Sequence, residues 1–246
     1  MPEQPEQQAP PVQRLRIRYA KRGRLRFTSH RDFSRAFERA VFRARIPMAY
    51  SSGFNPHPRI SYAGAAPTGS ASEAEYLEIA LAQVVEPADV HVALDEALPD
   101  GLDVLEVVVS SGGALADRLE GSAWRLTLPG VAAGAAGEAV ETFLGADEVL
   151  VSRMTKKGLR TFDCREAVVS LTSHQAAPSA GECAILDVVL RHGTPSVRPD
   201  DILAGLREVA GLEATAAPLQ ERLAQGPLDP RTGTVGDPLR PDRDAE

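Results

Sequence analysis

Two histidines occupy positions from which an imidazole could transfer a proton. His30 falls in the first turn of a predicted helix, where free backbone amides and the helix dipole favour a phosphate or carboxylate. His57 lies between Pro56 and Pro58, which stiffen its loop. Because imidazole ionises near neutral pH, the pair could act as acid and base in metal-independent RNA cleavage or transfer, provided that both rings reach one phosphate. The alternative for His30 is a surface histidine without a role, and the alternative for His57 is a place in a rigid connecting loop.

The second chemical feature is a dense run of guanidinium groups. Residues 14–45 contain twelve Lys or Arg against two acids, a net charge of +10, although the whole chain carries −7 and the remainder therefore −17. Such asymmetry is typical of a surface that meets an anion, and nucleic acid is the commonest large one. The alternative is a solvated, Arg-rich strand and helix. The nucleic-acid-binding candidates are Arg16, Arg18, Arg31, Arg35, Arg39, Arg43, Arg59, Lys156 and Lys157.

A strand and a helix must position these cations. Leu15, Ile17 and Tyr19 alternate with arginines, which is the pattern of a strand with one apolar and one cationic face. Apolar residues then recur at helical spacing over 33–44, while Arg31, Arg35, Arg39 and Arg43 step by four along another face. We expect the strand and helix arginines and the His57 loop to converge on one electropositive wall.

Local signals mark both ends of this helix. Ser29 and Asp32 have the spacing of a capping box, which gives them a structural role at the helix start. The loop after Pro47 holds Tyr50, Phe54 and Asn55, and Phe54 or Tyr50 could stack on an exposed base. The alternative is a rigid crossover in which Phe54 fills the core.

Composition predicts a cytoplasmic protein without metal or cofactor. The 246 residues are 43 % hydrophobic and 25 % charged, which suits one large or two smaller domains. No apolar stretch approaches the roughly 20 residues that span a bilayer, and the polar start does not resemble a signal peptide. The only cysteines, Cys164 and Cys183, lack partners at metal-site spacing and are read as buried or idle thiols.

The order of predicted elements gives an α+β fold with tandem ferredoxin-like (βαββαβ) units and antiparallel sheets. Residues 13–113 fit the order strand, helix, strand, strand, helix, strand, and a similar order recurs over residues 114–225. The first unit carries the basic surface. Residues 1–12 and 226–246 are too poor in apolar residues to fold alone and are predicted to be disordered.

The run SHRDFSRAFERAVFRARIPMAYSSGFNPHPRISYAGAAPTG closely resembles the N-terminal signature of the radical-SAM-linked protein family, a domain of unknown function. The similarity extends over roughly residues 14–223. Arg31 replaces the usual apolar residue, and Ser52 replaces the usual Glu, which weakens any role for an acid in that loop. The resemblance implies a stand-alone protein, or one fused to the C-terminus of a cobalamin-binding radical-SAM protein. It also implies gene neighbours such as an RNase E/G-type ribonuclease. The chain lacks Cys-x-x-x-Cys-x-x-Cys, so any radical step belongs to a partner.

Two functions follow. The favoured one is a non-catalytic accessory module that binds RNA, either rRNA or tRNA, for a radical-SAM or ribonuclease partner. The alternative is an RNA-processing enzyme that uses His30 and His57, by analogy with other tandem ferredoxin-like proteins.

Overall fold

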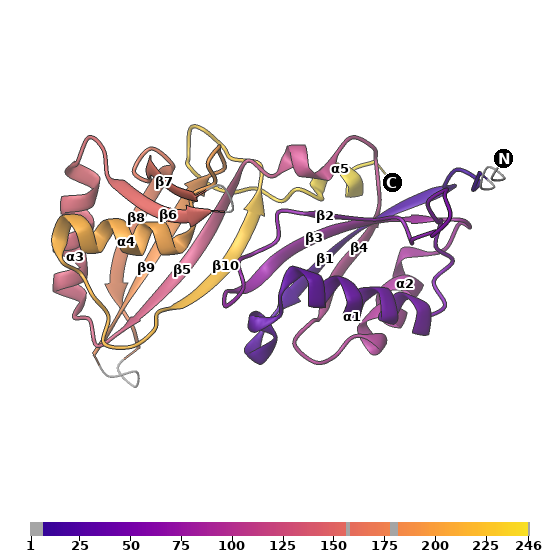
Figure 1. Ribbon diagram of the computed structural model, residues 1–246, viewed down its shortest axis with the longest axis horizontal. Helices are drawn as coiled ribbons and strands as arrows, with labels where there is room; N and C mark the ends of the chain where they lie inside the picture. The colour runs from indigo at the N-terminus through magenta and orange to yellow at the C-terminus, as the bar shows by residue number, and fades with distance from the viewer. Residues whose placement is uncertain (1–6, 156–157, 178–181, 246) are drawn as a thin grey trace. The chain divides into compact units, whose positions relative to one another are not determined.

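A computed structural model describes residues 7–155, 158–177 and 182–245. The chain divides into two compact units. Unit 1 comprises residues 1–118 together with 237–246, and unit 2 comprises residues 119–236. The chain therefore leaves unit 1 once and returns to it near its C-terminus (Figure 1).

Unit 1 is a ferredoxin-like βαββαβ unit. Its elements are β1 (Gln13–Lys21), α1 (His30–Arg43), β2 (Ile60–Ala63), β3 (Ala71–Leu81), α2 (Pro87–Ala97) and β4 (Val104–Val109), with a short 3-10 helix, η1 (Gly23–Phe27), after β1. The strands pair antiparallel in the spatial order β4-β1-β3-β2. Both helices cover the same face of this sheet (Figure 1).

The periodicity of the sequence explains which face the helices cover. Leu15, Ile17 and Tyr19 of β1 are buried against both helices, because alternate side chains of a strand point to the same face. The matching stripe on α1 is formed by Phe33, Phe37, Ala40 and Val41. The Tyr19 and Phe33 rings stack with centroids 4.5 Å apart, which fixes the start of α1 over the sheet.

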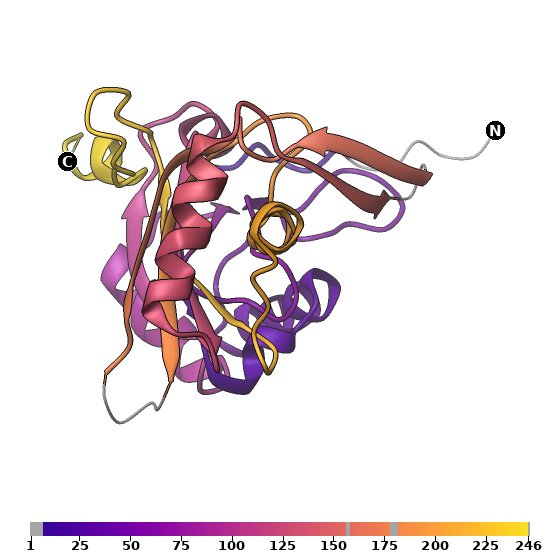
Figure 2. The same ribbon diagram turned by 90° about the vertical axis from the view of Figure 1, so that its left-hand side faces the viewer.

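Unit 2 repeats the plan with one insertion. Its elements are β5 (Gly121–Pro129), α3 (Ala133–Gly145), β8 (Val168–Gln175), β9 (Cys183–Arg191), α4 (Pro199–Ala210) and β10 (Leu219–Gly226). The antiparallel order is β10-β5-β9-β8, which corresponds to that of unit 1. The inserted hairpin of β6 (Leu150–Thr155) and β7 (Gly158–Asp163) extends from the unit (Figure 2). The predicted tandem α+β fold is therefore confirmed.

The C-terminal segment differs from the prediction of disorder for residues 226–246. Residues 228 and 235 form a β-bridge, and α5 (Arg240–Arg243) packs on unit 1, where Leu239 and Asp242 are buried. The segment has few apolar residues, but buried ion pairs hold it in place. At the other end, residues 1–6 of the predicted N-terminal tail lie outside the described residues, and the Gln8 amide donates to Ser52 Oγ at 3.0 Å.

Both cysteines are free and buried. Burial raises the pKa of Cys164 to about 12, so its thiol stays protonated at neutral pH. Within the described residues, no group of three or more His, Cys, Asp or Glu is placed to hold a metal ion. None of the helices in the described part has the length and apolar character that crossing a membrane requires.

Candidate nucleic-acid interface

The outer face of α1 carries a row of arginines. Arg31, Arg35, Arg39 and Arg43 are all exposed, and no described residue forms an ion pair or hydrogen bond with their guanidinium groups. Successive members lie four residues apart, which is about 6 Å along a helix. We call these four residues the α1 arginine row.

An aromatic ring lies within the α1 arginine row. Phe42 is 84 % exposed, although its neighbour Val41 belongs to the buried stripe. Together with Arg35, Glu38, Arg39 and Arg43, Phe42 lines a shallow hollow of about 600 Å³. Such a combination of an open ring face and surrounding guanidinium groups suits a base and its phosphates.

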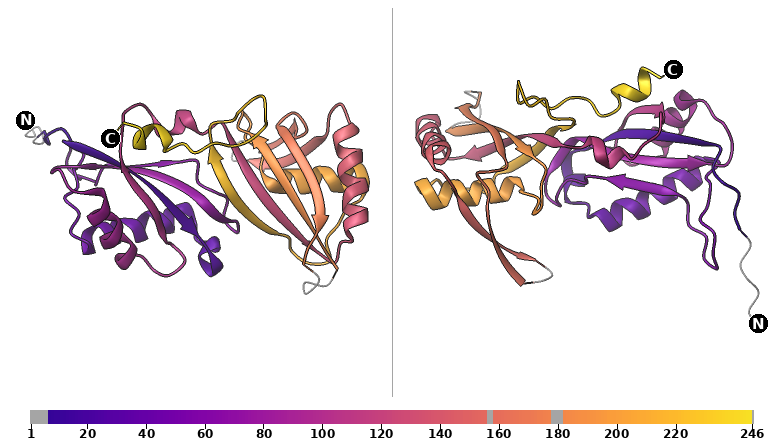
Figure 3. Two further views of the ribbon diagram at one scale, coloured as in Figure 1. Left: turned by 180° about the vertical axis from the view of Figure 1, so that it is seen from behind. Right: turned by 90° about the horizontal axis from the view of Figure 1, so that it is seen from above.

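The loop after α1 forms a hairpin over residues 49–59, which projects from unit 1 (Figure 3). The Ser51 amide donates to the His57 carbonyl at 2.9 Å, and the His57 amide donates to Ser51 Oγ at 3.0 Å. Gly53 has φ +131°, a conformation that other residues rarely adopt. The turn is therefore closed by specific bonds and by glycine, in addition to the prolines that the sequence shows.

The tip of the hairpin presents its side chains to solvent. Phe54 is 76 % exposed and Tyr50 is 41 % exposed, and Asn55 and His57 are also exposed. Phe54 consequently does not fill the core. This excludes the alternative in which the loop is a rigid crossover with the Phe54 ring in the core. Arg59 Nε donates to the Tyr50 carbonyl at 3.0 Å, so this predicted nucleic-acid ligand also closes the base of the hairpin.

His30 contacts an aromatic ring and makes no contact with His57. Its ring meets the Tyr62 ring edge-on, with centroids 4.9 Å apart, which places the start of α1 beside β2. Burial raises the pKa of Tyr62, whose hydroxyl is shielded from solvent close to Ser34. The hairpin with His57 begins beyond the other end of α1, about 20 Å away along a helix of 14 residues. Nothing described here assembles His30 and His57 into an acid and base pair.

Ser29 and Asp32 are engaged at the helix start. Ser29 Oγ accepts a hydrogen bond from the Asp32 amide at 3.2 Å and donates to the Asp32 carboxylate at 2.7 Å. These contacts satisfy a free amide and place a negative charge at the positive end of the helix dipole. The predicted role of Ser29 and Asp32 at the helix start is what these contacts show.

The strand arginines lie on the other side of the sheet, so the expected single wall does not exist. Arg16 is fully buried and binds Glu78 and Asp242. Arg18 Nε donates to the Glu73 carbonyl at 2.9 Å. Helices cover the apolar face of β1, so its arginines must point to the opposite face, and Arg16 is not an accessible nucleic-acid ligand. Lys156 and Lys157 lie outside the described residues.

Two aromatic residues of this region were not among the sequence candidates. Phe42 interrupts the polar face of α1 between Arg39 and Arg43. Because this position lies off the apolar stripe, the sequence alone indicates that the ring is exposed. Phe27 is 59 % exposed, and the Arg26 guanidinium lies 4.7 Å from its ring centroid. No periodic pattern marks Phe27, because it belongs to a short 3-10 helix without buried residues.

Comparison with known proteins places the chain in a family but gives no activity. No curated protein matches it. Among solved structures, it is similar to the crystal structure of a Cbf5–Nop10–Gar1 complex, at 10 % identity and a TM-score of 0.48. The likeness covers 91 % of this chain and 55 % of the matched chain, so this protein spans about half the length of that relative. A family described as uncharacterised proteins conserved in bacteria (DUF2344) matches residues 14–199, which is most of the chain, and this protein therefore belongs to that family.

Proposed function

We propose that this protein binds single-stranded RNA through the α1 arginine row and the 49–59 hairpin. The observation that carries the proposal is a row of four exposed guanidinium groups for which the described residues offer no acidic partner, with the Phe42 ring among them. Arginine neutralises phosphates, and exposed aromatic rings stack on unpaired bases.

The α1 arginine row is unfavourable for the isolated helix. Its four members form three consecutive like-charge pairs at i and i+4. Each such pair destabilises a helix by about 0.2–0.5 kcal/mol. Acids at these positions would relieve the repulsion, and the chain as a whole has more acids than bases. A polyanionic ligand offers a reason for keeping this arrangement, because it would turn the repulsion into attraction.

Single-stranded RNA fits better than a duplex because of the exposed rings. The bases of an RNA helix are stacked and its deep groove is closed to side chains, whereas loops and ends present free base faces. Phe42 and Phe54 would have no stacking partner on a duplex. We therefore place the target in an unpaired segment, such as a loop of rRNA or tRNA.

The accessory role is part of the same proposal. The resemblance of the His30 to Ser61 region to radical-SAM-linked proteins suggests that the RNA is presented to a radical-SAM protein or to a ribonuclease. Affinity purification of the full chain, followed by identification of the bound RNA and proteins, tests this part. Recovery of RNA without either class of enzyme would contradict the partner and leave RNA binding intact.

Charge reversal on α1 tests the RNA interface. Four phosphate contacts on a single strand give a slope of log K against log salt of about −3, since each contact contributes about −0.7. In the variant R35E/R39E/R43E, we expect the affinity for a labelled RNA to fall steeply and the slope to weaken by about two units. Fluorescence anisotropy over a salt series measures both.

The matched control reverses three exposed arginines of unit 2, in the variant R191E/R207E/R231E. It changes the net charge by the same amount and should bind RNA nearly as the natural chain does. Equal losses in the two variants would show that only total charge matters, and full binding by R35E/R39E/R43E would exclude the interface on α1.

A further inference from the structure

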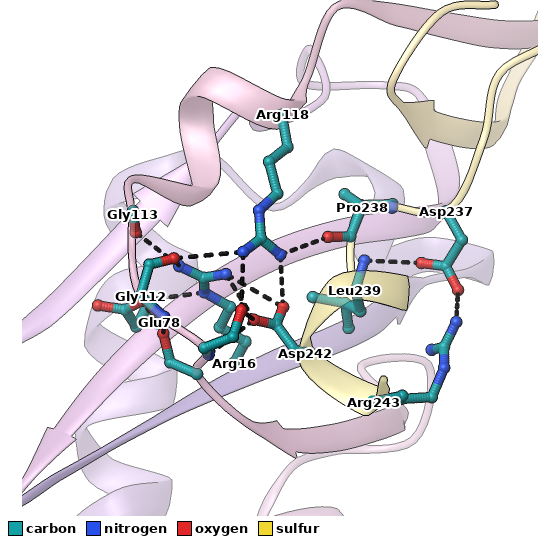
Figure 4. A network of polar contacts seen from close by, with 12 residues as sticks. Arg16, Glu78, Gly112, Gly113, Arg118, Asp237, Pro238, Leu239, Asp242 and Arg243 are labelled. Atoms are coloured by element: carbon teal, nitrogen blue, oxygen red, sulfur yellow. Dashed lines mark hydrogen bonds and ion pairs between the residues drawn. The ribbon is translucent and has the colours of Figure 1, made fainter. Parts of the chain in front are cut away.

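A buried carboxylate lies on the face of the unit 1 sheet opposite to α1 and α2. Asp242 of α5 is 1 % exposed, and Arg16 of β1 is fully buried beside it (Figure 4). The two residues are separated by 226 positions in the chain. Asp242 also lies outside residues 14–199, to which the family similarity extends.

Four donor groups converge on this carboxylate. Oδ1 of Asp242 accepts from Arg16 Nη1 at 2.8 Å, from the Ser111 amide at 2.9 Å and from Ser111 Oγ at 2.7 Å. Oδ2 accepts from Arg118 Nη1 at 2.7 Å and from Arg16 Nη1 at 3.1 Å. We call Arg16, Ser111 and Arg118 the donor cluster. Two guanidinium groups, a backbone amide and a hydroxyl are a set that binds any small oxyanion.

The donor cluster is positioned by contacts other than Asp242. Arg16 Nε donates to Glu78 at 3.0 Å, and Arg16 Nη2 donates to the carbonyls of Gly112 and Gly113 at 2.9 and 2.6 Å. Both glycines have positive φ, which allows the chain to turn at this point. Arg16 would therefore keep its orientation if the carboxylate left.

The local charge favours an anion with more than one negative charge. Arg14, Arg16 and Arg118 face the carboxylates of Glu78 and Asp242, so an excess of one positive charge remains even with Asp242 in place. Without Asp242 the excess is two. A phosphate monoester carries between one and two negative charges at neutral pH and has three strong acceptor oxygens.

There is also room for the rest of a ligand beside the donor cluster. A hollow of about 410 Å³ on unit 1 is lined by Arg14, Ser61, Glu78, Ser110, Gly112 and Gly113, among others. It shares Gly112 with the contacts of both arginines. A group attached to a phosphate in the donor cluster could lie in this hollow.

We propose that the donor cluster is a phosphate-binding site that the C-terminal segment fills with its own carboxylate. A phosphate group displaces Asp242 and with it α5. This site is separate from the α1 arginine row, which lies on the helix-covered side of the sheet. The phosphate can belong to a free phosphate ester or to the 5′ end of an RNA, and the two sources are distinguished below.

Inorganic phosphate and the variant D242N test the site. In a thermal melt at constant ionic strength, phosphate at tenfold excess over its dissociation constant should raise the Tm of D242N by about 3 °C or more. The natural chain should respond much less, because Asp242 competes. The exposed control variant D244N should behave as the natural chain, and R118A/D242N should lose the response. A folded D242N that responds equally to phosphate and chloride overturns the proposal.

A measurement on the natural chain decides the question even if D242N does not fold. The amides of Asp242 and Arg243 donate to the Leu239 carbonyl within α5. Phosphate should accelerate their hydrogen exchange, whereas chloride at the same ionic strength should not. Unchanged exchange at saturating phosphate overturns the proposal.

The same exchange measurement distinguishes the two sources of phosphate. A 5′-phosphorylated RNA that accelerates exchange more strongly than its 5′-hydroxyl form identifies an RNA end, and equal acceleration by the two forms identifies a free ester. The response should persist in R35E/R39E/R43E, so failure of one site is distinguishable from failure of the other.

Discussion

At the residue scale, substitution of an exposed aromatic side chain should change RNA affinity without changing the stability of the fold. Phe42 contributes little to the core, because 84 % of it is already in contact with solvent. The variant F42A should therefore retain its stability in urea, yet lose at least about fivefold in RNA affinity, since stacking of one base contributes about 1–3 kcal/mol. Anisotropy titrations measure the affinity. The control L159A removes an exposed apolar side chain of unit 2 and should leave RNA binding unchanged.

Asp242 should make stability depend on pH in a defined window. Burial alone would raise its pKa, but hydrogen bonds from Ser111, Arg118 and Arg16 lower it below the ordinary value of 3.8. A carboxyl whose pKa is depressed by folding stabilises the protein above its unfolded pKa, about 3.9, and that stabilisation is lost as the pH falls through the folded value. Glu78 is the other carboxylate that faces this cluster.

We accordingly expect the hold of Asp242 on the C-terminal segment to weaken as the pH falls below the unfolded pKa of about 3.9, and to be lost below the lower pKa of the folded state. Urea unfolding of the natural chain between pH 3 and 6 should show a falling free energy at the acidic end, and D242N should show a flatter curve at a lower level. Parallel curves for the two proteins would show that Asp242 does not titrate in this way.

At the element scale, the 49–59 hairpin depends on the conformation of Gly53. A Cβ at this position would meet nothing within 4 Å, so the strain of G53A comes only from φ +131°. Such backbone strain costs about 1–3 kcal/mol. We expect G53A to loosen the hairpin and weaken RNA binding, as anisotropy would measure. G134A in α3 is the control, because Gly134 also has open space but no positive φ, and it should bind RNA normally.

The elements of this protein could be predicted from periodicity, but their contacts at long range could not. Alternation in β1 and the apolar stripe of α1 are local patterns, and they led to the correct α+β plan. The burial of Arg16 depends on Asp242, which follows in a segment that is too polar to suggest packing. The expected single electropositive wall contradicts the predicted fold itself. In this fold the helices cover the apolar face of the sheet, so the arginines of β1 and those on the outer face of α1 must lie on opposite sides.

At the scale of the whole molecule, the distribution of charge restricts where a polyanion can approach. Helices α1 and α2 of unit 1 differ in the sign of their charge. The arginine row lies on α1, whereas α2 and its flanks carry the exposed acids Glu86, Asp89, Asp95, Glu96 and Asp100. The ring contact of His30 with Tyr62 places α1 beside β2, and hydrogen bonds to Val104 place α2 beside β4. RNA should therefore contact unit 1 on its β2 side.

Crosslinking of RNA that contains 4-thiouridine tests this restriction in the intact chain. Thiouridine reacts with side chains in direct contact, and aromatic rings stacked on a base are the nearest. We expect mass spectrometry to find crosslinks in residues 27–59, which include Phe27, Phe42 and Phe54, and none in 86–100, where phosphates would meet acids. Because the overall charge of −7 disfavours unspecific binding, these crosslinks should disappear in R35E/R39E/R43E and persist in R191E/R207E/R231E. Crosslinks concentrated in unit 2 would move the interface away from α1.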